Sequence, residues 1–184
     1  RAVFAVPLHI PGNKIEGEPI TSTQDWLAAA KQDGHEIAAH GITHINLTKL
    51  SDIELTQELL EPQKVLQAST LIYPGGAYDD RVVQAAQQHY KTARTVKYGI
   101  NNMRPQDPLQ LKTINFTKNN FSVARANIHA LRAWIQNKWL IETYHMVSKE
   151  RSSLTHSALL DDLEAHLDFI TSLPIRITTI RDML

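Results

Sequence analysis

Two histidines four residues apart are the clearest chemical signal in the chain. His40 and His44 enclose Gly41, Ile42 and Thr43, and the chain has 9 histidines and no cysteine. Two histidines with this spacing on a turn of helix project to one side and can bind the same metal ion. The same spacing also arises by chance among so many histidines, and a pair of surface or capping histidines is the alternative interpretation. Without thiolates, any metal must be held by histidine and carboxylate.

A proline and two glycines form a second candidate element. Pro74, Gly75 and Gly76 directly follow the apolar segment 71–73, which predicts a short buried strand. Glycines at such a turn let backbone N–H groups approach a ligand closely enough to stabilise an oxyanion. The alternative is a simple tight turn between a strand and a helix. Tyr78, just beyond the turn, is an aromatic residue that we expect to line a groove.

A histidine follows a third strand-like segment, residues 139–144. His145 can act as a general acid for a leaving group, because the unperturbed pKa of histidine lies close to neutral. Taken alone, such a histidine is more often a hydrogen-bonded structural residue. Three candidates after three predicted strands favour one common site.

The elements that must position these residues alternate between strand and helix. Short apolar runs bounded by turn residues predict strands at residues 2–8, 35–39, 71–73, 92–96, 109–116, 139–144 and 175–178. Capping residues and helical spacing predict helices after Ser22 or Thr23, after Ser51, from Asp79, over 122–137 and over 159–170, with a closing turn over 179–184. We expect Pro62 to kink or restart the second helix. This order predicts an α/β fold with a largely parallel sheet, whose carboxyl strand ends gather the functional residues.

Composition excludes several classes of protein. The chain has 184 residues, which predicts one domain, and a formal net charge of zero, which argues against nucleic acid as a partner. No apolar run approaches the roughly 20 residues of a membrane span, and the first residues lack the features of a signal peptide. The tryptophans Trp26, Trp134 and Trp139 lie in apolar periodic segments and are predicted to be core residues.

The order of these motifs resembles the polysaccharide deacetylase family, also called the NodB homology domain or carbohydrate esterase family 4. Residues 34–44 resemble its Gly-His-Glu-Ile segment leading into the His-x-x-x-His metal motif, and residues 72–76 resemble a variant of its third motif. Residues 143–145 are similar to the late strand that carries its general acid, and residues 3–6 to its second barrel strand. The family's first motif, a strand with two aspartates, would precede Arg1, so we expect a single domain over 1–184 that is N-terminally incomplete.

The resemblance implies a distorted (β/α) barrel, here without its first strand, that binds one divalent metal. Zinc is the expected metal, and cobalt or nickel would also suit two histidines and a carboxylate. His40 and His44 would be the metal ligands, with the third ligand an aspartate upstream of Arg1. The N–H of Gly75 would hold the oxyanion and His145 would be the general acid. Substrate contacts would come from the residues around the glycine turn, namely Tyr73, Pro74, Gly76 and Tyr78.

The chain also departs from the family pattern at several positions. Ile72 stands where many members have an arginine, Gly75 where they have a tyrosine, and Met146 where an aspartate is common. These changes concern the groups around the catalytic residues and the tuning of His145.

The function expected from the resemblance is hydrolysis of N- or O-linked acetyl groups on a polysaccharide such as peptidoglycan, a chitin-like glycan or an exopolysaccharide. An extracytoplasmic location is the corresponding expectation. One alternative is a degenerate domain that binds glycan without turnover. Another is a different metal hydrolase that takes a third ligand from within the chain, for which Asp25 and Asp79 are loose candidates.

Overall fold

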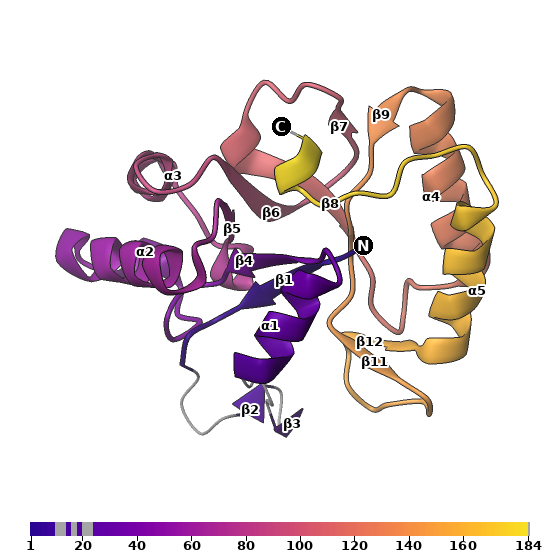
Figure 1. Cartoon of the computed structure of the whole chain (residues 1–184), viewed down its shortest axis with the longest axis horizontal. Coiled ribbons are helices and arrows are strands. Elements are labelled where there is room, and N and C mark those ends of the chain that lie inside the picture. The colour runs from indigo at the N-terminus through magenta and orange to yellow at the C-terminus, as the bar shows by residue number, and fades with distance from the viewer. Residues whose placement is uncertain (10–13, 16–17, 20–23, 184) are drawn as a thin grey trace. The chain divides into compact units, whose positions relative to one another are not determined.

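A computed structural model of the chain describes residues 1–9, 14–15, 18–19 and 24–183. Helices and strands alternate over residues 24–98, as predicted, whereas several short strands follow one another on either side of the helix at residues 123–135 (Figure 1). The strands are β1 (Val3–Val6), β2 (Lys14–Ile15), β3 (Glu18–Pro19), β4 (Glu36–Ala39), β5 (Thr70–Ile72), β6 (Thr92–Tyr98), β7 (Asn101–Asn102), β8 (Leu111–Asn115), β9 (Lys138–Trp139), β10 (Glu142–Thr143), β11 (Met146–Ser148) and β12 (Ser157–Leu159).

The helices follow the predicted apolar spacing and capping residues. They are α1 (Gln24–Gln32), α2 (Asp52–Leu66), α3 (Asp80–Gln87), α4 (Val123–Ile135) and α5 (Leu160–Thr171), with short 3-10 turns at Leu47–Lys49, Pro74–Gly76, Pro108–Gln110 and Arg181–Met183. Ser51 caps α2 with a complete capping box to Glu54, and Asp79 and Ser122 cap α3 and α4. The predicted caps Ser22 and Thr23 lie outside the described residues.

The principal sheet has the strand order β1-β4-β5-β6-β8-β10 within the described residues. The pairs β1 with β4, β4 with β5, β5 with β6, and β8 with β10 are parallel. Strands that are parallel neighbours end at the same edge, so the residues that follow β4 and β5 lie on neighbouring strand ends. The predicted α/β fold with a largely parallel sheet is confirmed.

Three predicted elements differ from the structure. Residues 175–178 form no strand, because this segment finds no partner among the described strands. The predicted strand 139–144 is divided, since β9 pairs antiparallel with β7 while β10 pairs with β8. The helix α2 continues through Pro62, which lies inside it, and does not restart there.

The described chain divides into two compact units. The first comprises residues 1–95, 107–111 and 178–184. Its core gathers apolar residues of β1, β4, β5 and the helices α1 to α3, including Ile37, Leu59, Leu71 and Val82. The helices α1 and α2 pack against β4, which fixes the strand that His40 follows.

The second unit comprises residues 96–106 and 112–177. Its helices α4 and α5 lie side by side (Figure 1). A small core joins Ile114, Phe116 and Ala126, with Phe121 and Tyr144 packed against it. Across the described residues of both units, no helix has the length and apolar character needed to cross a membrane.

The tryptophans do not all lie in the core. Trp139 is buried as predicted, but Trp26 and Trp134 expose 38% and 45% of their surface. Apolar spacing identified the side of the helix on which these residues lie, but large rings at the margin of that side stay partly in solvent.

Candidate functional site

The segment from His40 to His44 directly follows β4 and is a loop. Gly41 has φ +75° and His44 has φ +59°, and both values are left-handed and incompatible with a continuous α-helix. The predicted turn of helix is therefore wrong. A non-glycine residue in this conformation carries a strain of about 1–2 kcal/mol, so the surrounding structure must hold His44 in place.

The two histidine rings nevertheless lie side by side. The ring centroids of His40 and His44 are 4.6 Å apart with an interplanar angle of 69°. Proximity of the pair, which the spacing predicted, is thus present, but a bend in the loop produces it.

The protonation of both rings suits metal binding. The Nδ1 atom of His40 lies 2.7 Å from the carbonyl oxygen of Ile72. A carbonyl oxygen can only accept, so Nδ1 carries the proton, and in the neutral ring Nε2 carries the lone pair. Burial lowers the pKa of His44, which favours its neutral form. A histidine whose other ring nitrogen is fixed by a hydrogen bond to a carbonyl is the usual form of a metal ligand.

No third ligand joins the pair within the part of the chain that is described. No group of three histidine, aspartate or glutamate side chains there could hold a metal ion. Asp79 accepts a hydrogen bond from the N–H of Val82 at 2.8 Å and caps α3. The side chain of Asp25 lies outside the described residues. The pair therefore fits two of the three ligands of a histidine and carboxylate site.

Glu58 of α2 holds the loop between the histidines and was not identified from the sequence. Its Oε2 atom accepts hydrogen bonds from the N–H of Ile42 at 2.6 Å and of Thr43 at 3.3 Å. Its Oε1 atom accepts from the Oγ1–H of Thr43 at 2.7 Å. The signal was present in the sequence, because Glu58 lies three residues after Leu55 on the buried side of α2. A charged residue on an apolar face indicates a specific partner.

The turn after β5 adopts the compact form that its glycines allow. Gly75 has φ +59° and is exposed, and a Cβ atom there would meet nothing within 4 Å. The N–H groups of Gly76 and Ala77 donate to the carbonyls of Tyr73 and Pro74 at 2.8 and 3.2 Å. The turn is close to the histidine loop, since a Cβ on Gly41 would lie 3.3 Å from Cγ of Pro74.

The tyrosines around this turn have different roles. Tyr73, expected to contact substrate, is 1% exposed, and its hydroxyl donates to the carbonyl of Leu109 at 3.1 Å. Burial raises the pKa of Tyr73, and the nearby Tyr78 adds to this effect. Tyr73 is therefore a core residue, and the expectation of a substrate contact through its side chain is corrected. Pro74 is also buried, while Gly76 and Tyr78 are half-buried. The Tyr78 ring stacks on the Tyr73 ring, with the ring centroids 5.1 Å apart.

His145 belongs to the second unit. It follows β10 and Tyr144, its side chain is exposed, and its ring centroid lies 4.8 Å from that of His156. The N–H of the next residue, Met146, donates to the carbonyl of His156 at 3.0 Å, where β11 begins to pair with β12. The position after a parallel strand agrees with the prediction, and the role of His145 stays a prediction.

A buried histidine also lies in the second unit. His166 is 0% exposed, and its ring nitrogens lie 2.7 Å from Oδ1 of Asn127 and 2.9 Å from Oε2 of Glu142. Glu142 also accepts a hydrogen bond from the Tyr144 hydroxyl at 3.3 Å. Both ring nitrogens are engaged, so His166 joins α5 to α4 and β10 as a structural residue.

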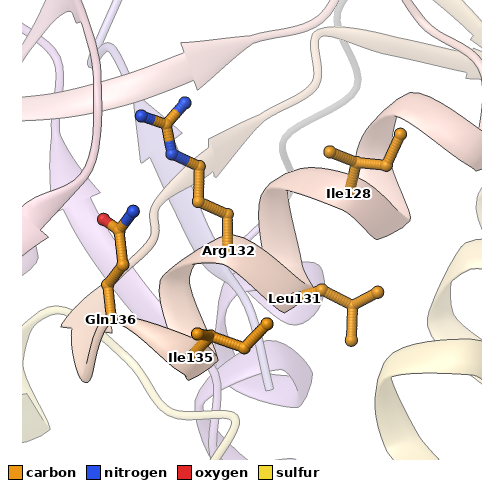
Figure 2. A pocket seen from close by; sticks show the side chains of 5 residues that line it. All are labelled: Ile128, Leu131, Arg132, Ile135 and Gln136. Carbon is orange, nitrogen blue, oxygen red and sulfur yellow. The ribbon is translucent and has the colours of Figure 1, made fainter.

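Two surface hollows occur in the second unit. One of about 290 Å³ lies on α4 and is lined by Ile128, Leu131, Arg132, Ile135 and Gln136 (Figure 2). Another of about 530 Å³ is lined by residues that include Tyr98, Phe116, Arg125 and His129. None of the predicted site residues lines either hollow.

Comparison with known proteins finds a family match for just under half of the chain. The model of the polysaccharide deacetylase family matches residues 8–93. That segment contains the histidine pair, Glu58 and the glycine turn, and His145 lies beyond it. This segment of the chain is therefore similar to the polysaccharide deacetylase family. A search of curated proteins found no match.

Solved structures resemble the chain in fold. The Streptococcus pyogenes deacetylase PplD in complex with acetate is 26% identical, with 52% of this chain and 45% of that chain covered and a TM-score of 0.47. A family 4 carbohydrate esterase from Streptomyces lividans in complex with acetate is 15% identical, with 81% and 66% covered and a TM-score of 0.51. A family 4 pseudoenzyme from Bacillus anthracis is 11% identical, with 86% and 50% covered and a TM-score of 0.53.

The last two likenesses establish the fold, which is the predicted polysaccharide deacetylase type. The chain spans less than half the length of the Streptococcus pyogenes protein and half that of the Bacillus anthracis protein.

Proposed function

We propose that the protein is a metal-dependent hydrolase that removes N- or O-linked acetyl groups from a polysaccharide such as peptidoglycan, a chitin-like glycan or an exopolysaccharide. The observation that carries this proposal is the adjacent pair His40 and His44, with Nδ1 of His40 fixed on a backbone carbonyl, inside the segment that matches the family. We also propose an extracytoplasmic location, because such polymers mostly lie outside the cytoplasm.

Each residue of the site has a proposed task. His40 and His44 would hold the metal together with an aspartate that we expect upstream of Arg1, and zinc is the first choice, with cobalt and nickel as alternatives. A metal held there would supply polarisation of the acetyl carbonyl and a lower pKa of the attacking water. The N–H of Gly75 donates to the developing oxyanion, and His145 protonates the departing amine or alkoxide. Pro74, Gly76 and Tyr78 border the path of the glycan, while the ring of Tyr73 supports them from the core.

The direct test is acetate release by the full-length protein from acetylated peptidoglycan, chitin oligomers and an acetylated exopolysaccharide. Release should stop after treatment with a chelator, return on addition of zinc, and be absent from the His40→Ala, His44→Ala double variant. His145→Ala should lower kcat by about 10²–10⁴-fold, the range expected for a general acid. Inactivity of the wild type on every glycan would count against the proposal.

The second candidate is a domain of the same fold that binds glycan without turnover. The observation that favours it is that no carboxylate joins the histidine pair among the described residues. Saturable binding of the same glycans without acetate release, in the presence of zinc, would select this candidate.

A further inference from the structure

Glu58 is a charged residue on the buried side of α2. It is 8% exposed, and its neighbours on that side of the helix are Leu55, Leu59 and Pro62. A buried carboxylate is costly unless hydrogen bonds compensate the lost hydration. Among the described residues, the compensating donors are the N–H groups of Ile42 and Thr43 and the hydroxyl of Thr43, all in the loop between the two histidines. Hydrogen bonds to an ionised acceptor are roughly twice as strong as neutral ones.

Gly41 is the residue that permits this approach. A Cβ atom on Gly41 would lie 2.8 Å from Oε2 of Glu58, closer than real Cβ contacts, and φ at this position is +75°. The left-handed backbone favours glycine here, and a Cβ atom would displace the Glu58 carboxylate from its present position.

The other side of the same loop is held by the segment after β1. The N–H of Leu8 donates to the carbonyl of Gly41 at 3.2 Å, and the N–H of His9 donates to the carbonyl of Ile42 at 2.6 Å. The peptide groups between the histidines are therefore fixed through their carbonyls by residues 8–9 and through their N–H groups by Glu58. A substitution can remove the side chain of Glu58 without changing the amino-acid sequence of the loop itself.

We propose that Glu58 is a positioning residue that fixes the loop from Gly41 to Thr43 and so holds the rings of His40 and His44 side by side for a shared metal. The metal part rests on the proposed function, whereas the fixing of the loop concerns the metal-free protein. If Glu58 contributed only to packing of α2, an apolar side chain of similar length would replace it without local effect on the loop.

The first measurement is amide hydrogen exchange by NMR in the metal-free protein. Glu58→Met removes both acceptors while keeping side-chain length and helix propensity, and Glu58→Gln keeps one acceptor oxygen. Exchange of the Ile42 and Thr43 amides should accelerate by about tenfold or more in Glu58→Met and by less in Glu58→Gln. The amides of β4 and β5 should keep their rates. Glu61→Met is the matched control, since Glu61 lies on the same helix and is exposed. Its rates should equal those of the wild type.

The second measurement is zinc affinity by calorimetry with the full-length protein. Glu58→Met should bind zinc about 10–100-fold more weakly, the usual effect of losing a group that orients metal ligands. Glu58→Gln should recover part of the loss, and Glu61→Met should bind like the wild type. Unchanged exchange at Ile42 and Thr43 in both Glu58 variants overturns the proposal, and so does equal acceleration of all amides. Local acceleration in a protein whose wild type binds no zinc would support the role of Glu58 in the loop and contradict the proposed metal function.

Discussion

His40 donates a hydrogen bond from Nδ1 to the carbonyl oxygen of Ile72, at the end of the neighbouring strand, over 2.7 Å. This bond determines the tautomer of the ring, because only the Nδ1-protonated form can make it. Long-range proton–nitrogen NMR spectra of the metal-free protein above pH 7 should show Nδ1 of His40 protonated and Nε2 bearing the lone pair. The opposite tautomer would contradict the geometry on which the metal site depends.

The left-handed backbone of His44 leads to an unusual order of stability. At φ +59°, a residue with a Cβ atom is strained and glycine is not. We expect His44→Gly to be more stable than His44→Ala by about 1 kcal/mol, the reverse of the order in regular helix or strand. Urea unfolding of the two variants, both of which lack the imidazole, measures this difference. Equal stability, or a more stable alanine variant, would show that the strain is absent.

The buried hydroxyl of Tyr73 predicts an effect on stability without an effect on chemistry. Tyr73→Phe removes the donor to the carbonyl of Leu109 and should lower the free energy of unfolding by about 1 kcal/mol. Acetate release should keep the wild-type kcat. Tyr98→Phe is the control, since Tyr98 is exposed and its unfolding free energy should not change. A fall in activity of Tyr73→Phe without a fall in stability would indicate that Tyr73 contacts the substrate.

The titration of His129 should depend on its neighbours along α4. Burial lowers the pKa of His129, Glu142 opposes this effect, and Arg125 and Arg132 add to it. NMR titration should place the pKa below the ordinary value of 6.5, and Arg125→Gln should raise it. Arg151→Gln, which removes an exposed charge elsewhere in the same unit, should leave it unchanged.

The lowered pKa of His129 also determines how the stability of the fold changes with pH. As pH falls below 6.5, the unfolded chain takes up the proton at this position before the folded protein does, so the contribution of His129 destabilises the fold progressively until its own lowered pKa is reached. Glutamine at position 129 should remove this part of the acid sensitivity. An unchanged acid sensitivity of His129→Gln would contradict the assignment.

Local sequence signals predicted much of the fold. The capping box from Ser51 to Glu54 and the caps Asp79 and Ser122 mark helix starts through bonds between near neighbours, and all three are confirmed. The strand predicted at residues 175–178 was wrong, because a strand forms only with a partner strand and pairing depends on distant segments. The division of residues 138–143 between β9 and β10 is likewise set by their partners β7 and β8.

The candidate site was only partly predicted, because it too depends on contacts between distant segments. The sequence showed the spacing of the histidines and their position after β4. The bend that brings the two rings together depends on Glu58, which lies 14 residues beyond His44. Tyr73 was misassigned because sequence proximity to the glycine turn does not show whether a ring points into the core.

The proposed function depends on metal binding by His40 and His44. Elemental analysis of the full-length protein, compared with its His40→Ala, His44→Ala double variant, measures this binding. We expect about one equivalent of zinc per chain in the wild type and none in the folded double variant. A wild type that binds no zinc, or a double variant that retains it, would contradict the proposed metal site.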